Sequence, residues 1–536
     1  MNDSTSVAKS AGLSILLFST SLSIPLLAAG EDLVPARPGT APNYWCTWSV
    51  QNYMFGIGTR SLDPKEVEGG AGAAHARLVM NESNVFGSTG WVTTFFPRVR
   101  GDLYVMYDDG LFRDGTGSFQ IDEKKFPFLA GLDSAERMRR LNERTRAAGW
   151  RGAALWCRGP ATRGEAATNL VLWSRHAGVE YWKIDGGDGH FAFIDLAQGL
   201  YPALKLEHIQ GSGPFNGNWQ GGEVGRFGKY QADWHEGQCL EHSDVFRTYD
   251  VSPPLSFPTT LDRVAEALRY GNDHPVRAFI NCEDEVYTAA TLGCTMGIMR
   301  HPLIGLRPDG DIDCAFSCPR QCKQRMDEVV RALRWQRLAP PFAHFNQAPG
   351  VTASVRDGNV THIDEQILVD AWTFKTGETW LAEAIGKTIR QGAPARVSRG
   401  LPLPEVNSDG DPPFVIAGRF PNGAVAVAVQ GRTVLSKNWI FPAAAVTLQV
   451  GSANAPVGVF GHYRSLTLRF SAPLGRVHVL AQDLAGERAE DITSQVLIKD
   501  NRLTLPGGLI DKVGLSAASQ GDTSDPGLVL VIRKQT

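Results

Sequence analysis

The feature that most constrains the fold of this chain is a repeated alternation of strand-like and helix-like segments between about residues 40 and 345. Short apolar runs typical of buried strands occur at 103–107, 153–156, 179–184, 203–206 and 276–280. Helical patterns occur between and after these runs, at about 134–148, 165–177, 260–270 and 323–338. This spacing is typical of parallel βα units, and more than six such units favour a (β/α)8 TIM barrel, an α/β fold. An open, doubly wound sheet is the alternative.

The pattern changes after about residue 400, where short alternating or β-rich runs are separated by Gly, Pro and Asn. These runs lie at 414–416, 424–429, 445–450, 465–470, 477–480 and 528–532. They predict an antiparallel β-sandwich. The expected organisation is therefore a barrel over 30–345, a segment over 346–400 that completes the barrel or links the two parts, and an accessory sandwich over 401–536.

Residues 1–29 are typical of a secretory signal peptide. Lys9 precedes an apolar stretch over 11–27, which ends in small residues and predicts cleavage near Ala29. A membrane anchor is the alternative, but several serines and Pro25 interrupt the stretch and make spanning less favourable. The sequence therefore predicts a protein exported to the periplasm or the medium, with no membrane attachment after cleavage.

The charge of the chain is nearly balanced, with 53 Lys and Arg against 56 Asp and Glu. This balance argues against a nucleic-acid partner, which normally requires a concentrated basic surface. A hydrophobic fraction of 43% excludes global disorder. An uncharged carbohydrate is the substrate that fits this balance best, whereas the oligomeric state stays open.

The chain has eight cysteines, at 46, 157, 239, 282, 294, 314, 318 and 322. The last three recur every four residues, which lacks the two-residue spacer and the fourth ligand of a zinc site. Buried thiols or one local disulfide are expected instead. We therefore expect neither a metal nor a cofactor.

Carboxylates follow the predicted strands. They are Asp108 and Asp109 after 103–107, Asp185 after 179–184, Glu207 after 203–206, Asp244 after the run 239–243, and Glu283 and Asp284 after 276–280. In a barrel all of these strand ends open onto one face. Any one acid could cap a helix, but gathering several costs stability through mutual repulsion, which points to function. Glycoside cleavage uses two such carboxylates.

Several short motifs in this order resemble clan D glycoside hydrolases, the α-galactosidase (melibiase) group, in a distant or bacterial-branch form. They are Tyr107-Asp108-Asp109-Gly110-Leu111, Gly117 to Asp122, Lys125-Phe126-Pro127, Tyr181 to Asp185, and Ser243-Asp244. The chain departs from the family pattern at Leu111, where the group has Trp. It also has Gly110 and Gly187 where one branch has a pair of bridging cysteines.

The resemblance implies a retaining double displacement with Asp185 as nucleophile and Asp244 as acid/base. It also implies a set of sugar-binding residues, namely Asp108, Asp109, Lys183 and Glu207. Position alone adds Asp284 to the substrate-binding candidates, and Trp156 could stack on a sugar or belong to the barrel core.

The function expected from the sequence is an exported α-galactosidase-like hydrolase. The alternatives are a glycosidase of the same fold for an α-glucoside, an α-N-acetylgalactosaminide or an arabinopyranoside, and a carbohydrate-binding protein without catalysis.

Overall fold

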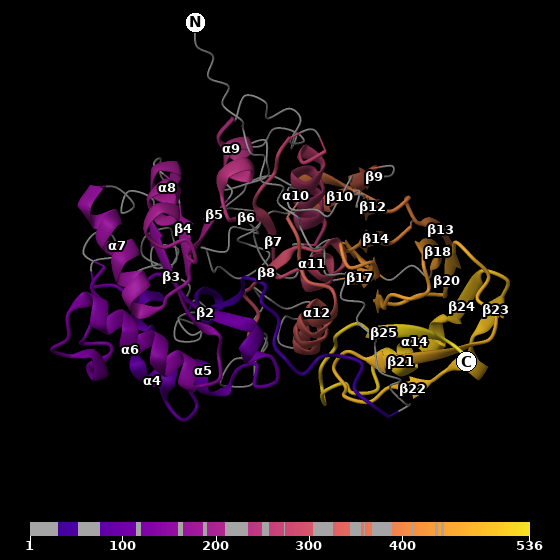
Figure 1. Cartoon of the computed structure of the whole chain (residues 1–536), viewed down its shortest axis with the longest axis horizontal. Coiled ribbons are helices and arrows are strands. Elements are labelled where there is room, and N and C mark those ends of the chain that lie inside the picture. The colour runs from indigo at the N-terminus through magenta and orange to yellow at the C-terminus, as the bar shows by residue number, and fades with distance from the viewer. Residues whose placement is uncertain are drawn as a thin grey trace, which may run out of the picture.

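Eight short segments form the parallel strands of a closed barrel, which confirms the predicted fold class over an open sheet (Figure 1). They are β1 (Asn43–Cys46), β2 (Leu103–Tyr107), β3 (Gly152–Arg158), β4 (Tyr181–Asp185), β5 (Lys205–Ile209), β6 (Val245–Thr248), β7 (Phe279–Glu283) and β8 (Thr295–Ile298). The barrel closes where Tyr44 and Trp45 of β1 pair with Gly297 and Ile298 of β8. A Cβ on Gly297 would lie 2.6 Å from the Tyr44 hydroxyl, so glycine makes room for that ring inside the barrel.

The structure is a computed structural model. It describes residues 30–51, 76–113, 119–158, 164–185, 190–209, 234–248, 257–272, 274–303, 325–343, 355–357, 360–366, 389–409, 412–434, 438–440 and 444–535. The predicted signal peptide over 1–29 and the cysteines at 314, 318 and 322 lie outside these residues.

Helices alternate with the barrel strands. They are α4 (Glu82–Phe86), α5 (Trp91–Thr94), α6 (Ser134–Ala147), α7 (Gly164–Ala177), α8 (His190–Leu200), α9 (Trp234–His242), α10 (Phe257–Tyr270), α11 (Val286–Leu292) and α12 (Met326–Leu338). Asp133 caps α6 by accepting a hydrogen bond from the backbone N–H of Glu136. Gly149 and Gly178, with φ of 92° and 63°, follow α6 and α7 in the left-handed conformation that ends many helices. None of the described helices is both long and apolar enough to cross a membrane.

Two β-sheets form the C-terminal part. The larger sheet has the order β22 (Glu490–Asp491), β21 (Val477–Asp483), β25 (Gly527–Lys534), β19 (Val457–Phe460), β15 (Val425–Gln430), β14 (Phe414–Arg419), β12 (Arg396–Arg399) and β9 (Val355–Asp357). The smaller sheet has the order β13 (Glu405–Ser408), β18 (Ala444–Gly451), β20 (Ser465–Phe470), β24 (Arg502–Pro506) and β23 (Leu497–Lys499). Alternate residues of β20 are buried, as expected for a strand with one face against a core.

The sheets are mixed, which corrects the prediction of a purely antiparallel sandwich. The pairs β12–β14, β15–β19 and β18–β20 are parallel. Strands β9 and β12, from the segment 346–400, belong to the larger sheet rather than to the barrel. Two further pairs, β10 (Val360–Gln366) with β11 (Ile389–Pro394) and β16 (Arg432–Val434) with β17 (Asn438–Ile440), lie outside both sheets, and α14 (Gly507–Gly514) follows β24.

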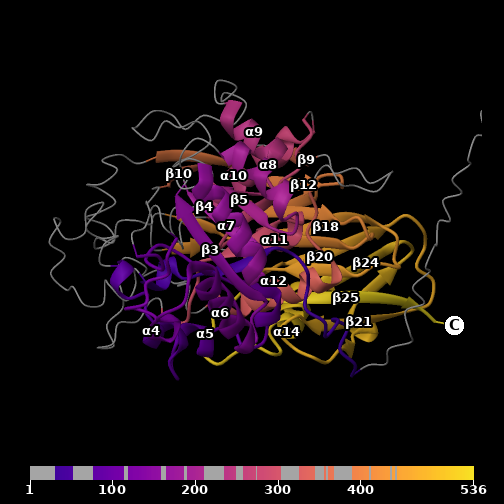
Figure 2. The ribbon, with the colours of Figure 1, turned by 60° about the vertical axis from the view of Figure 1, so that its left-hand side comes forward.

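Helices α11 and α12 join the barrel to the larger sheet, and both views place them between the two (Figures 1 and 2). Glycines in the sheet allow the helices to approach closely. A Cβ on Gly418 of β14 would overlap the carbonyl oxygen of Thr291, and one on Gly458 of β19 would lie 3.0 Å from the Trp335 ring. The barrel and the larger sheet therefore share one continuous apolar core.

A buried ion pair also links the two parts. Arg331 of α12 donates to both carboxylate oxygens of Asp483 in β21, at 2.9 and 3.1 Å, and both side chains are fully enclosed. Two-point geometry of this kind compensates the cost of removing both charges from water better than a single contact does.

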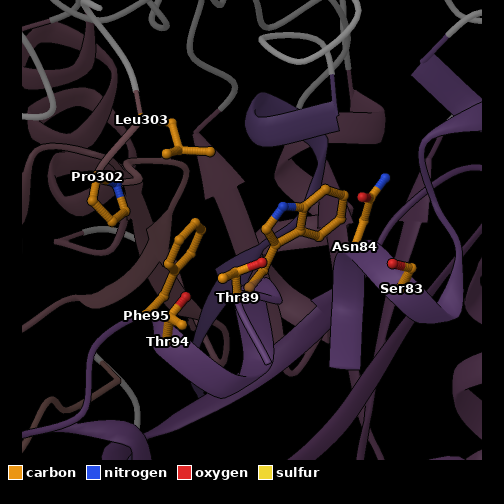
Figure 3. A pocket seen from close by; sticks show the side chains of 8 residues that line it. Ser83, Asn84, Thr89, Thr94, Phe95, Pro302 and Leu303 are labelled. Atoms are coloured by element: carbon orange, nitrogen blue, oxygen red, sulfur yellow. The ribbon is translucent and has the colours of Figure 1, made fainter. Parts of the chain in front are cut away.

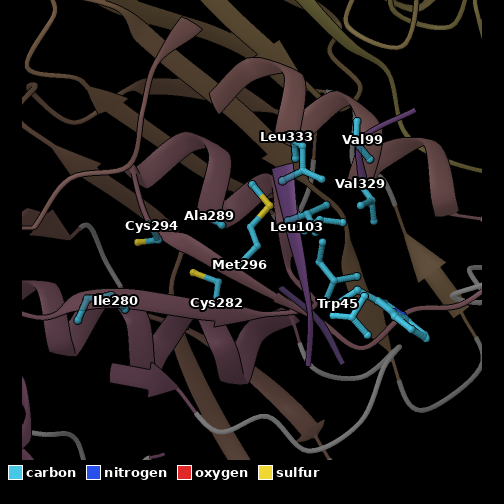
Figure 4. Packing of buried hydrophobic residues seen from close by; sticks show 14 of the residues in the cluster. Trp45, Val99, Leu103, Ile280, Cys282, Ala289, Cys294, Met296, Val329 and Leu333 are labelled. Carbon is cyan, nitrogen blue, oxygen red and sulfur yellow. The ribbon is translucent and has the colours of Figure 1, made fainter. Parts of the chain in front are cut away.

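The five described cysteines, Cys46, Cys157, Cys239, Cys282 and Cys294, are free and buried. Figure 4 shows Cys282 and Cys294 among the apolar side chains between β7, β8 and α11. The prediction of buried thiols or one local disulfide concerned Cys314, Cys318 and Cys322, which lie outside the described residues.

We expect Gly418→Ala to lower the free energy of unfolding by about 3 kcal/mol, because the new methyl group overlaps backbone that has no room to move. Gly508→Ala is the matched control, since Gly508 is exposed in α14 and a Cβ there meets nothing. Urea unfolding of the two variants measures the difference. Equal unfolding free energies would show that the close approach of α11 is not required.

Candidate active site

The candidate site is the end of the barrel that is formed by the C-terminal ends of its parallel strands. Asp108 directly follows β2, Asp185 is the last residue of β4, and Glu283 is the last residue of β7. Catalytic groups in barrels of this class lie on this face. Much of the chain that follows the strands here lies outside the described residues, so the strands themselves define the floor of the site.

Lys183 and Asp108 form a buried ion pair on this floor. The Lys183 ammonium lies 2.6 Å from Asp108 Oδ2, and both side chains are 4% exposed. The Cys46 thiol donates to the same oxygen at 3.1 Å, and the Asp108 backbone N–H donates to Thr47. Burial opposes ionisation of Asp108, but the Lys183 charge and the hydrogen bonds that the carboxyl group accepts from Lys183, the Asp109 backbone N–H and Cys46 together lower its pKa.

Arg247 of β6 connects two further carboxylates. Its guanidinium lies 2.7 Å from Glu283 and 3.7 Å from Glu207, and all three side chains are buried. Burial raises the pKa of Glu283 to about 7 even though Arg247 opposes the shift. The pKa of Glu207 is raised for the same reason. Glu283 therefore holds a proton up to neutral pH, which suits a proton donor.

Asp185 is the half-buried carboxylate of the group. The Trp156 indole N–H donates to its Oδ2 at 3.4 Å. The positive charges of Lys183 and Arg247 both interact electrostatically with the Asp185 carboxylate. Trp156 itself is only 3% exposed, so it lies in the barrel wall and orients Asp185 rather than offering an open stacking face.

Asp109 and Asp284, two more predicted substrate contacts, are engaged by the protein itself. Arg77 binds Asp109 Oδ2 at 2.6 Å, while the buried Oδ1 makes no hydrogen bond within the described part of the chain. Asp284, at φ 59°, accepts hydrogen bonds from the backbone N–H groups of Met299 and Arg300, which holds the chain after β8 against β7.

Glu207 lies in the middle of β5 rather than at its end, which corrects the sequence prediction. It accepts hydrogen bonds from Tyr44 at 3.0 Å, Tyr181 at 2.6 Å and Asn281 at 3.2 Å, and none of its surface is exposed. Glu207 therefore fills the barrel interior beneath the candidate site.

Asp244 lies at the opposite end of the barrel, so the structure does not bring it together with Asp185. It precedes β6, because the run at 239–243 belongs largely to helix α9 rather than to a strand. Its carboxylate accepts the Leu206 backbone N–H at 3.1 Å and lies 3.5 Å from the Lys205 ammonium. The strand register places Asp185 three residues beyond this level, about 10 Å along the strands.

Arg247 and Glu283 are the two residues that sequence reasoning missed. Glu283 was visible as an acid after a strand-like run, but its neighbour Asp284 was preferred. Arg247 lies in Val245-Phe246-Arg247-Thr248, a β-rich run whose period of two would have indicated an inward-facing cation. Within the described ranges, no group of three or more His, Cys, Asp or Glu residues is arranged to hold a metal ion.

Comparison with known proteins adds little to this geometry. No known family profile matches the sequence, and no curated protein matches it. Among solved structures, a Paenibacillus polymyxa xyloglucanase from glycoside hydrolase family 44 aligns with 80% of this chain at 10% identity and a TM-score of 0.17. The alignment covers 66% of that enzyme, slightly less than two thirds of its length. This similarity is too weak to assign a family or an activity.

We expect Lys183→Met to lower the free energy of unfolding by about 3–5 kcal/mol, because it leaves the buried Asp108 without its counter-charge. Lys205→Met is the matched control. It also removes a lysine beside an aspartate, but that lysine is 38% exposed and its loss should cost less than about 1 kcal/mol. Similar losses in urea unfolding would refute the buried pair as a stabilising element.

The raised pKa of Glu283 predicts a dependence of stability on pH. Between pH 4.5, the ordinary pKa, and about 7, the folded protein keeps a proton that the unfolded chain has lost. The free energy of unfolding should therefore fall by about 3 kcal/mol from this group as the pH rises through that window. Glu283→Gln should remove this contribution. If the free energies of unfolding of the wild-type protein and of Glu283→Gln changed in parallel with pH, the raised pKa of Glu283 would be contradicted.

Proposed function

We propose that this protein is a glycoside hydrolase that acts at the end of the barrel where Asp185 and Glu283 lie. The observation that carries the proposal is the contrast between these two carboxyl groups. Asp185 is half-buried and faces two cations, whereas burial raises the pKa of Glu283 to about 7. Glycoside hydrolysis uses two carboxyl groups on either side of the scissile bond, one of which donates a proton.

In the proposed retaining reaction, the Asp185 carboxylate attacks the anomeric carbon as Glu283 gives its proton to the departing glycosidic oxygen. The Glu283 carboxylate then takes a proton from water, whose oxygen displaces Asp185 from the sugar. Glu283 replaces Asp244 as acid/base, because it lies at the same end of the barrel as Asp185. The buried acceptor Asp109 Oδ1 supplies one polar contact for a sugar hydroxyl.

We propose α-galactosides as the substrate class and export as the setting. The family resemblance supports the first, because three of its motif residues, Asp108, Lys183 and Asp185, lie near one another in the site. The signal-like residues 1–29 support the second. A panel of aryl α-galactosides, α-glucosides, α-N-acetylgalactosaminides and arabinopyranosides tests the sugar. Sugar binding without turnover of any member would favour a carbohydrate-binding protein.

The roles of the two carboxyl groups predict different defects. Asp185→Asn should abolish turnover of every aryl glycoside, because no covalent intermediate forms. Glu283→Gln should lower turnover of a nitrophenyl glycoside by about 100-fold or more, while a dinitrophenyl glycoside, whose leaving group needs no proton, should still release its phenol rapidly. Steady-state and burst kinetics measure both effects.

Asp244→Asn is the control, since this carboxylate lies at the far end of the barrel. It should leave turnover of the nitrophenyl glycoside unchanged. A larger loss in Asp244→Asn than in Glu283→Gln would restore the assignment made from sequence and overturn the present one.

A further inference from the structure

A second cavity lies outside the barrel mouth, between the α4–α5 segment and the chain that follows β8 (Figure 3). Its volume is about 450 Å³, within the range of small-molecule sites. Asp284 anchors one wall, because its carboxylate holds the backbone of Met299 and Arg300 just before Pro302 and Leu303. None of the eight residues that line the cavity is charged.

The lining combines neutral hydrogen-bonding groups with aromatic surface. Ser83, Asn84, Thr89 and Thr94 contribute hydroxyl and amide groups, and Figure 3 shows Thr89 and Thr94 beside Phe95 with Ser83 and Asn84 on the other side. The Thr94 hydroxyl already donates to Gly90 and the Asn84 amide already donates to Val79, so both offer acceptors to a ligand. Ser83 and Thr89 are exposed and can both donate and accept.

Trp91 gives an independent indication that this cavity receives a polar ligand. Its side chain lines the cavity and is 3% exposed as a whole. Its indole N–H makes no hydrogen bond with any described residue and is not itself fully enclosed, so it can donate to a molecule in the cavity. Buried indole N–H groups normally have a partner. The comparable indoles of this protein do, with acceptors Arg300 for Trp45, Val92 for Trp150, Ser174 for Trp182 and Ala290 for Trp335.

We propose that this cavity binds a neutral sugar ring, at a site separate from the candidate active site. A pyranose presents hydroxyl groups that both donate and accept, together with an apolar face, and the cavity offers the complement of each. An anionic or cationic ligand would enter without a counter-charge, which disfavours it. The inference does not depend on catalysis at Asp185 and Glu283.

The test is direct binding of sugars to the full chain, measured by saturation-transfer NMR and calorimetry. The probes are methyl α-galactopyranoside, methyl α-glucopyranoside, cellobiose and the charged sugar glucuronate. At least one neutral probe should bind, and Thr89→Val should weaken its binding about fivefold, the effect of losing one hydrogen bond. Thr93→Val is the matched control, because Thr93 is an exposed threonine of α5 that does not line the cavity. It should change the affinity by less than about twofold.

Two comparisons separate this site from the candidate active site. Thr89→Val should turn over aryl glycosides at the wild-type rate. Asp185→Asn should bind the neutral probe at this cavity with the wild-type affinity. The proposal is overturned if no neutral probe binds, if glucuronate binds more tightly than all of them, or if Thr89→Val and Thr93→Val bind equally well. Loss of turnover in Asp185→Asn with no binding at this cavity would leave the proposed hydrolase standing and reject the second site.

Discussion

The enclosure of charge inside the closed barrel is the constraint on which the rest of the site depends. Two cations, Lys183 and Arg247, face three buried carboxyl groups, and little water is available to stabilise an excess of negative charge. Asp108 has Lys183 as its own counter-charge at 2.6 Å, whereas the Arg247 guanidinium is shared between the carboxylates of Glu207 and Glu283. Burial of the Glu283 carboxyl group is the main cause of its raised pKa of about 7, which the charges of Arg247 and Lys183 oppose and those of Asp284 and Glu207 reinforce. The proposed proton donor is thus a consequence of the enclosure of Glu283 in the barrel.

The second organising contact joins the two parts of the chain. Helices α11 and α12 cover the barrel on one side and support the larger sheet on the other, so neither surface is left to solvent. Gly418 and Gly458 permit the approach, and the Arg331–Asp483 pair fixes its position. Since α11 directly follows Glu283 and Asp284, this packing also holds the end of β7 in place.

Periodicity in the sequence was sufficient to predict the barrel, the β-rich C-terminal part and two of the key acids. Asp108 and Asp185 were placed correctly because each lies at the end of a β-rich run that contains Tyr and is clearly bounded. The errors arose where the local signal was ambiguous. The run at 239–243 is short and partly apolar, and such a run does not distinguish a strand from a helix, so Asp244 was assigned to the wrong end of the barrel. The predicted strand ended at Leu206, whereas β5 ends three residues later at Ile209, which places Glu207 inside the strand.

Local order of apolar and polar residues established by itself that this chain alternates strands and helices and that its acids follow strands. Parallel pairing, including the contacts of β12 with β14 and of β15 with β19, depends on residues far apart in the chain and has no local signature. The protonation of Glu283, the ion pair of Lys183 with Asp108, and the position of Arg247 between two carboxylates likewise follow from burial, which only the packed barrel creates. The same holds for the cavity beside Trp91, because its walls come from segments more than 200 residues apart.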